Sequence, residues 1–119
     1  MSYDIKLIDP VTKMVLELEN PHHMKGGTYC VGGTTEATLN VTYNYSPILR
    51  KVFNPEKGIR ELYGKTGAET IPMLDAIAAQ LGDDVSADYW QATEGNVKAV
   101  LLQLKALATM RPDGVWAGD

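Results

Sequence analysis

One stretch of the chain limits the fold more than any other, the ten residues EATLNVTYNY at positions 36–45. Apolar and polar residues alternate along it, which is the period of a β-strand with one buried and one polar face. The stretch predicts a strand whose apolar side contacts a core, formed by Ala37, Leu39, Val41, Tyr43 and Tyr45. We expect the polar side to stay open, and it carries Thr38, Asn40, Thr42 and Asn44.

Other segments of the first half also predict strands. YDIKLI (3–8) and KMVLEL (13–18) flank the turn sequence DPVT, in which Asp9 can accept a hydrogen bond from a backbone amide two residues later. This pattern predicts a hairpin. TYCV (28–31) predicts a shorter strand with a buried Cys30, and the glycines of GGTT (32–35) can adopt positive φ, so a second hairpin is expected.

The second half carries helix signals. Ser46 before Pro47 predicts the N-cap of a helix over PILRKVF, and Asn54 before Pro55 predicts the same for PEKGIRELY. Gly64 should end that second helix.

Two longer helices are predicted after position 65. IPMLDAIAAQL (71–81) has apolar residues at helical spacing. Thr66 and Glu69 have the spacing of a capping box, but a start there would place Pro72 deep in the helix, so we predict a later start. Thr93 is expected to cap the strongest helix, TEGNVKAVLLQLKALATM (93–110), which RPDG ends. Its predicted apolar stripe is formed by Val97, Val100, Leu101, Leu104, Leu107 and Ala108.

Strands followed by helices predict an α+β fold. We expect a small antiparallel sheet of about four strands in the N-terminal half, packed on one face by C-terminal helices. The chain has 119 residues, so a single domain over 1–119 is predicted.

Composition restricts the cellular setting and the partners. Apolar residues make up 45% of the chain, yet no apolar run approaches the roughly 20 residues that span a bilayer, so no membrane partner is expected. The start of the chain lacks a signal-peptide pattern and Cys30 is its one cysteine, which together predict a cytoplasmic setting. A net charge of −4 argues against general nucleic-acid binding.

The stretch NPHHMKGGTYCVGGTTE (20–36) contains both histidines and the cysteine. Adjacent histidines in an extended segment point to opposite sides, and no HxH, HxxxH or CxxC spacing is present. We therefore expect no metal and no cofactor. The stretch is interpreted as a connector that also lines a binding surface through His22 and His23.

A second stretch, GIRELYGKT (58–66), resembles a phosphate-binding loop, but five residues rather than four separate its glycines. The motif is rejected. The amides of Gly64 to Gly67 are still expected to be free before a helix and able to hold an anion.

Packing does not require the polar strand face or the basic residues at positions 50–65. Asn40, Thr42 and Asn44 are therefore candidate binding residues, together with Arg60 and Lys65 in an otherwise acidic chain. Trp116 near the end of the sequence is a further candidate, with two alternatives: it docks on the domain, or it meets a partner.

Several segments together resemble a family of small proteins encoded in phages and prophages of Gram-positive, often gut, bacteria: HHMKGGTY, LNVTYNYS, GIRELYGKTGAETIP, DDVSADYWQATEGNVKAVL and MRPDGVW. The resemblance spans nearly the whole chain. It implies a small, soluble phage product that acts inside the host cell, and it carries over no catalytic or binding residue. Such proteins often block host machinery, including defence systems, or sequester a small signalling molecule.

Three functions therefore remain open. The first is a binding protein without turnover, whose partner is a host protein or an anionic small molecule. The second is a small nucleotide-handling enzyme that uses the loop at 22–29 with Arg60 or Lys65, which requires these groups to converge in one pocket. The third is a virion or assembly component, which predicts oligomers. The lack of a catalytic constellation in the sequence favours the first.

Overall fold

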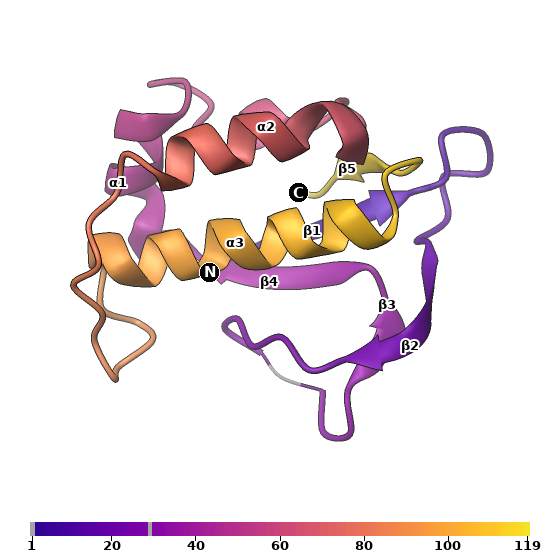
Figure 1. Cartoon of the computed structure of the whole chain (residues 1–119), viewed down its shortest axis with the longest axis horizontal. Helices are drawn as coiled ribbons and strands as arrows, with labels where there is room; N and C mark the ends of the chain where they lie inside the picture. The colour runs from indigo at the N-terminus through magenta and orange to yellow at the C-terminus, as the bar shows by residue number, and fades with distance from the viewer. Residues whose placement is uncertain (1, 29) are drawn as a thin grey trace.

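The structure is a computed structural model that describes residues 2–28 and 30–119 (Figure 1). Four strands precede the helices along the described chain, and one short strand follows them near the end of the sequence. In chain order the elements are β1 (Ser2–Ile8), β2 (Glu17–His22), β3 (Thr34–Glu36), β4 (Thr38–Thr42), the 3₁₀ helix η1 (Tyr43–Tyr45), α1 (Ser46–Val52), the 3₁₀ helix η2 (Ile59–Leu62), α2 (Gly67–Ala78), α3 (Glu94–Met110) and β5 (Val115–Ala117).

The strands form two antiparallel sheets. The larger has the order β4-β1-β5, and β2 pairs with β3 in a separate two-stranded sheet. Opposite residues in the larger sheet include Ile5 with Leu39 and Leu7 with Trp116, which brings both ends of the sequence into one layer. The predicted α+β class is confirmed.

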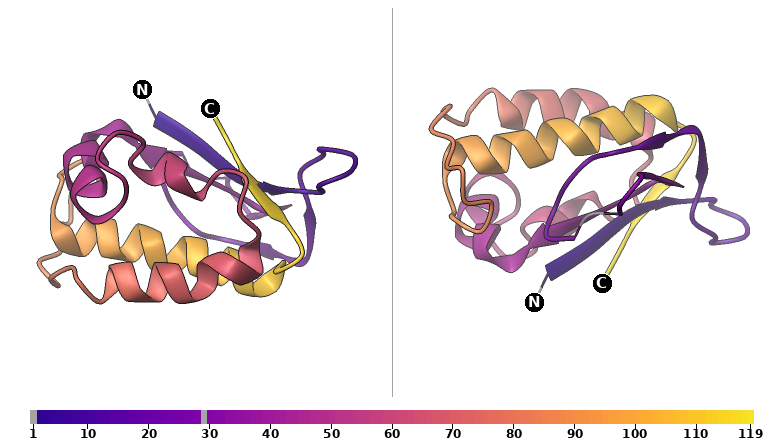
Figure 2. Two further views of the ribbon diagram at one scale, coloured as in Figure 1. Left: turned by 90° about the horizontal axis from the view of Figure 1, so that it is seen from above. Right: turned by 90° about the horizontal axis from the view of Figure 1, so that it is seen from below.

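Helices α2 and α3 pack together on one face of the three-stranded sheet (Figure 2). The apolar residues of that face are almost completely buried, as are those of the stripe predicted for α3. Within residues 2–28 and 30–119, no helix covers the opposite face. The core residues of the sheet and of α3 are Tyr3, Ile5, Leu7, Leu39, Val41, Trp116, Val97, Val100, Leu101, Leu104, Leu107 and Ala108.

The strand predictions need three corrections. The alternating stretch at 36–45 is not one strand, because β3 ends at Glu36, β4 covers Thr38–Thr42 and a 3₁₀ helix follows. TYCV forms no strand at its described positions, and Cys30 is exposed instead of buried. Tyr29 lies outside the described residues. Val15 makes an isolated bridge to Ile8, so the first predicted hairpin exists in part, but its second strand begins at Glu17.

The predicted helix over 55–63 is wrong. The side chain of Asn54 accepts the amides of Glu56 and Lys57, 2.8 and 3.0 Å away, which forms a turn rather than a helix cap. Gly58 then has φ of 58°, a conformation that breaks a right-handed helix. Only η2 remains of the expected helix, and Gly64 follows it with φ of 91°.

The starts of two helices also differ from prediction. Helix α2 begins at Gly67 with the complete Thr66–Glu69 capping box and tolerates Pro72 inside it. Partners from elsewhere in the chain hold this start, because Gly67 and Ala68 donate their amides to backbone oxygens at positions 114 and 112. Ser46 is the first residue of α1 rather than its cap, and its hydroxyl bonds that of Tyr3 at 2.7 Å.

Candidate functional site

The face of the three-stranded sheet turned away from α2 and α3, which we call the outer face, is made by alternate residues of its strands. Each described residue of this face is exposed or half-buried, apart from Thr42. Opposite pairs such as Asp4 with Asn40 and Ile8 with Val115 place its side chains next to one another. Its open part comprises Ser2, Asp4, Lys6 and Ile8 of β1, Thr38 and Asn40 of β4, and Val115 and Ala117 of β5.

The polar end of the outer face is organised around Asn40. Its side-chain nitrogen donates to the Asp4 carboxylate at 2.6 Å and to the Ser2 hydroxyl at 2.7 Å. These bonds hold the amide in one orientation. Pre-positioned groups of this kind reduce the ordering cost of binding.

A cleft of about 260 Å³ opens on this face between β1, β4 and the end of β3. Its walls carry two carboxylates, Asp4 and Glu36, and one ammonium, Lys6. Val15, which is half-buried, supplies apolar surface. The cleft can therefore take one long side chain, and its charges favour a cation over an anion.

The connection between β1 and β2 projects from the body beside the Ile8 end of the outer face (Figure 1). Asp9 holds it in shape, since its carboxylate accepts the amides of Val11 at 2.8 Å and Thr12 at 2.9 Å. The amides of Thr12 and Val11 keep the pKa of Asp9 below its usual range. At the tip, Val11 is 86% exposed and Met14 is 70% exposed.

Other segments close the free edge of β4. The amide of Gly27 donates to the Asn40 backbone oxygen at 3.1 Å, and a Cβ at Gly26 would overlap that oxygen. The Tyr89 hydroxyl accepts the amide of Thr42 at 3.0 Å. The edge therefore cannot add another strand, and the open surface of this sheet is its outer face.

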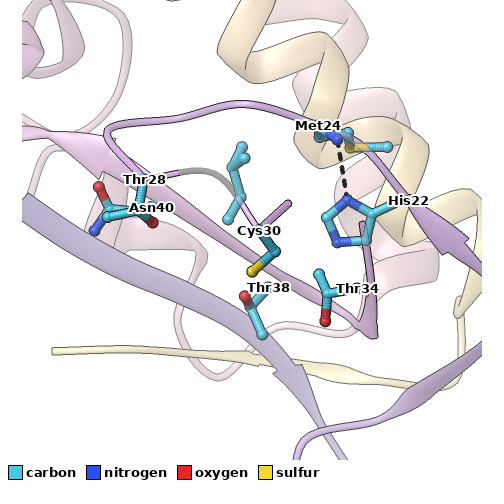
Figure 3. Close-up of a pocket in the computed structure, with 8 residues that line it drawn as sticks. His22, Met24, Thr28, Cys30, Thr34, Thr38 and Asn40 are labelled. Carbon is cyan, nitrogen blue, oxygen red and sulfur yellow. Dashed lines mark hydrogen bonds between the residues drawn. The ribbon is translucent and has the colours of Figure 1, made fainter. Parts of the chain in front are cut away.

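The loop before β3 encloses a second, smaller cavity of about 30 Å³, room for about one or two water molecules (Figure 3). His22 and Cys30 line it from the loop side, while Thr38 and Asn40 line it from β4. Both ring nitrogens of His22 have partners, the backbone oxygen of Glu36 at 2.9 Å and the amide of Met24 at 3.3 Å. Nδ1 accepts and Nε2 donates, so His22 holds the loop to β3.

The two histidines have different surroundings. His22 is 9% exposed, whereas His23 is exposed and its ring lies against Gly33. A search of the described part of the chain finds no group of three or more histidine, cysteine, aspartate or glutamate residues placed to hold a metal ion.

The expectation of free amides at Gly64 to Gly67 is wrong. Gly64 donates to the Trp116 backbone oxygen at 2.9 Å, and Lys65 donates to that of Leu62 at 3.0 Å. Thr66 donates to the Glu69 carboxylate at 2.8 Å, and Gly67 to the backbone oxygen of residue 114 at 2.8 Å. With each amide bonded within the chain, the segment offers no anion cradle.

Three predicted binding residues make hydrogen bonds within the fold. Thr42 is 1% exposed and its hydroxyl accepts the Asn44 amide at 3.1 Å. The Asn44 side chain is exposed but donates to the Trp90 backbone oxygen at 2.9 Å. Trp116 is 1% exposed and donates from Nε1 to the Thr70 hydroxyl at 2.8 Å, so of the two alternatives it docks on the domain.

The structure separates the remaining candidates. Asn40 and His22 line the small cavity, and Asn40 also faces the cleft. Arg60 lies over the rings of Tyr3 and Tyr43 at 4.8 and 5.8 Å. Lys65 lies beside β5, where its backbone oxygen accepts the Trp116 amide at 2.9 Å. Neither Arg60 nor Lys65 lines the two pockets of the described chain to which His22 contributes.

Sequence reasoning missed the apolar tip at Val11 and Met14. The sequence contained a signal for this tip. Val11 and Met14 follow the turn-forming pair Asp9–Pro10, and apolar side chains in a projecting turn remain exposed. Nothing in the pattern indicated that this tip would adjoin the outer face, since that depends on the pairing of Ile8 with Val15.

Comparison with protein-family models, with curated proteins and with solved structures gave no match for this chain. Within the described residues, no helix is both long and apolar enough to span a membrane.

Proposed function

We propose that this chain is a phage-encoded binding protein that acts inside the host cell by occupying the surface of a host protein, without turning it over. Host defence components are one class of such target. The observation that carries the proposal is the outer face, a sheet surface without a covering helix among the described residues. It joins a pre-positioned polar end at Asn40 to an apolar end at Ile8, Val115 and the tip of the 9–14 turn.

The chemistry of this surface favours a protein over an anionic small molecule. Asp4 and Glu36 line the cleft and repel an anion, while a lysine or arginine side chain can enter between them. Around the cleft, Ile8, Val15 and Val115 offer apolar contact, and Thr38 and Asn40 offer directional hydrogen bonds. Such a mixture is typical of protein interfaces.

The proposal is tested by recovering partners with tagged protein from lysate of an infected or prophage-carrying host, followed by native mass spectrometry. Two variants target the surface, Thr38→Arg in the cleft and the pair Val11→Asp with Met14→Asp at the tip. Thr109→Arg on α3 is the matched control, because this threonine is exposed on the helical layer. We expect both surface variants to lose a partner that the control retains.

Two outcomes would contradict the proposal. Equal recovery by wild type and by both folded surface variants would exclude the outer face. Retention of a small molecule with no protein partner would replace the proposal by ligand sequestration.

A further inference from the structure

The backbone edge of β1 points to a second binding site. Strand β1 pairs with β4 over Ser2–Lys6, but with β5 only over Lys6–Ile8. Among the described residues, no strand pairs with the first half of β1 on the β5 side. Asp4 presents its backbone groups to that side, since its partner Asn40 directs its own backbone oxygen away from β1 to Gly27.

Residues 118 and 119 occupy this unpaired edge without forming a strand. The Asp4 amide donates to the side-chain carboxylate of Asp119 at 2.9 Å. A Cβ at Gly118 would lie 2.7 Å from the Asp4 backbone oxygen, so only glycine fits so close to this edge. A carboxylate thus takes the place of a neighbouring strand.

Arg60 lies over the same position. Its guanidinium carbon is 4.8 Å from the centre of the Tyr3 ring and 5.8 Å from that of Tyr43. It donates from Nε to the Asp119 backbone oxygen at 2.7 Å and from Nη2 to the Tyr43 hydroxyl at 3.2 Å. The two tyrosines orient the cation, which reduces the entropy lost when an acceptor arrives.

The guanidinium retains capacity for a further ligand. It has five N–H groups, and the two bonds above use two of them. The side-chain ion pairs among the described residues involve Lys98, Lys105 and Arg111, so Arg60 has no carboxylate side chain as its partner. An exposed, aromatic-stacked arginine of this kind suits a planar carboxylate.

We propose that Arg60 and the Asp4 edge of β1 form a binding site for an extended acidic segment of a protein partner, and that residues 118 and 119 occupy this site in the free protein. The segment adds to β1 through the Asp4 backbone groups, which is the general mode of β-augmentation. Its acidic side chain bonds the remaining N–H groups of Arg60. Gly118 and Asp119 are displaced when it binds.

The proposal extends beyond the outer face and does not depend on it. The outer face uses side chains that point away from the sheet, whereas this site uses an in-plane edge and a cation beside the ring of Tyr3. If the experiments exclude binding at the outer face, the proposal for Arg60 and the Asp4 edge is unaffected, and the reverse also holds.

The test uses the 119-residue chain labelled with nitrogen-15 and two tripeptides, acetyl-Ala-Gly-Asp-amide and the neutral acetyl-Ala-Gly-Asn-amide. The Asp119→Ala variant removes the side-chain carboxylate that occupies the Asp4 amide. Because an occupied site lowers apparent affinity in proportion to its free fraction, we expect this variant to bind the acidic peptide about fivefold or more tightly than wild type. Chemical-shift changes should centre on the Asp4 amide and the Arg60 Nε–H.

The matched controls replace arginines in the Asp119→Ala background. Arg60→Gln should weaken acidic-peptide binding about tenfold or more, whereas Arg50→Gln on exposed α1 should not change it. Thermal unfolding of each variant establishes that it is folded. The neutral peptide should bind weakly to all of them.

Three results would overturn the proposal. The first is equal affinity of wild type and Asp119→Ala for the acidic peptide. The second is equal affinity of the Arg60→Gln and Arg50→Gln variants for that peptide. The third is binding of inorganic phosphate as tight as that of the acidic peptide. The first two would leave Arg60 with a purely structural role, and the third would indicate a general anion site.

Discussion

The two faces of the three-stranded sheet are built from the same strands, one residue apart, and they differ in almost every physical respect. On the inner face, Ile5, Leu7 and Val41 are completely buried beneath α2 and α3. On the outer face, Asp4, Lys6 and Thr38 remain exposed or half-buried. The comparison teaches that alternate residues of one strand meet different surroundings, so the outer face can be altered without disturbing the buried inner face.

The largest effect is expected in the core beneath the inner face. Leu101→Ala leaves a cavity where the side chain is 0% exposed and should lower the free energy of unfolding by about 2–5 kcal/mol. Leu102→Ala is the adjacent control, since Leu102 is 43% exposed, and it should cost less than about 1 kcal/mol. Urea unfolding measures both. A similar loss of unfolding free energy in the two variants would show that Leu101 is not more important to the core than the exposed Leu102.

A smaller effect is expected at the inner-face tryptophan. Trp116→Phe keeps a ring but removes the hydrogen bond to the buried Thr70 hydroxyl, which should cost about 1–3 kcal/mol. Trp90→Phe is the control at a position that is 49% exposed. A cost for Trp116→Phe no greater than that of the control would show that the Thr70 bond adds nothing to stability.

Alkaline pH should weaken the fold through tyrosine. Burial raises the pKa of Tyr45 to about 12, and burial likewise raises that of Tyr63 to about 12. Unfolded tyrosines ionise near about pH 10, so the unfolded chain binds fewer protons above that value. The stabilisation is complete below about pH 10 and is lost as pH rises towards about 12.

The measurement is the urea midpoint of wild type and Tyr45→Phe between these pH values. The variant loses its hydrogen bond to the Tyr89 backbone oxygen, so it should be less stable at neutral pH yet decline less steeply. Identical slopes for the two proteins would show that Tyr45 does not contribute to alkaline unfolding.

The smallest effect is expected on the outer face. Lys6→Ala should change the free energy of unfolding by less than about 0.5 kcal/mol, because a half-buried lysine on this surface has no packing role in the core. If the outer face binds a partner, the same substitution should still alter partner recovery. A destabilisation as large as that of Leu101→Ala would mean that this surface is part of the core.

Local signals in the sequence predicted much of the fold because they act between near neighbours. The Thr93 cap and the apolar stripe predicted α3, and Asp9 forms the turn expected of DPVT. The same reasoning failed at 55–63. The Asn54 side chain can accept backbone amides either as a helix cap or in a turn, and here it forms a turn that leads into Gly58 at positive φ.

The candidate site was predictable only in part. Asn40 lies on an open surface as its alternation indicated, but Thr42 does not, although the two occupy equivalent positions in the pattern. The difference arises from Tyr89, which reaches the Thr42 amide from a distant loop. The alternation of apolar and polar residues cannot predict a contact between residues so far apart in the chain.

The sequence by itself determined the α+β class, the buried faces of β4 and α3, and the turn at Asp9, because periodicity and capping depend on residues close together in the chain. Tertiary structure alone decided β5, whose three residues become a strand by pairing with β1 and the 64–66 segment. It also decided the start of α2 and the placement of Arg60 beside Asp119. These features depend on residues far apart in the chain, and folding brings such partners together through the burial of a shared core.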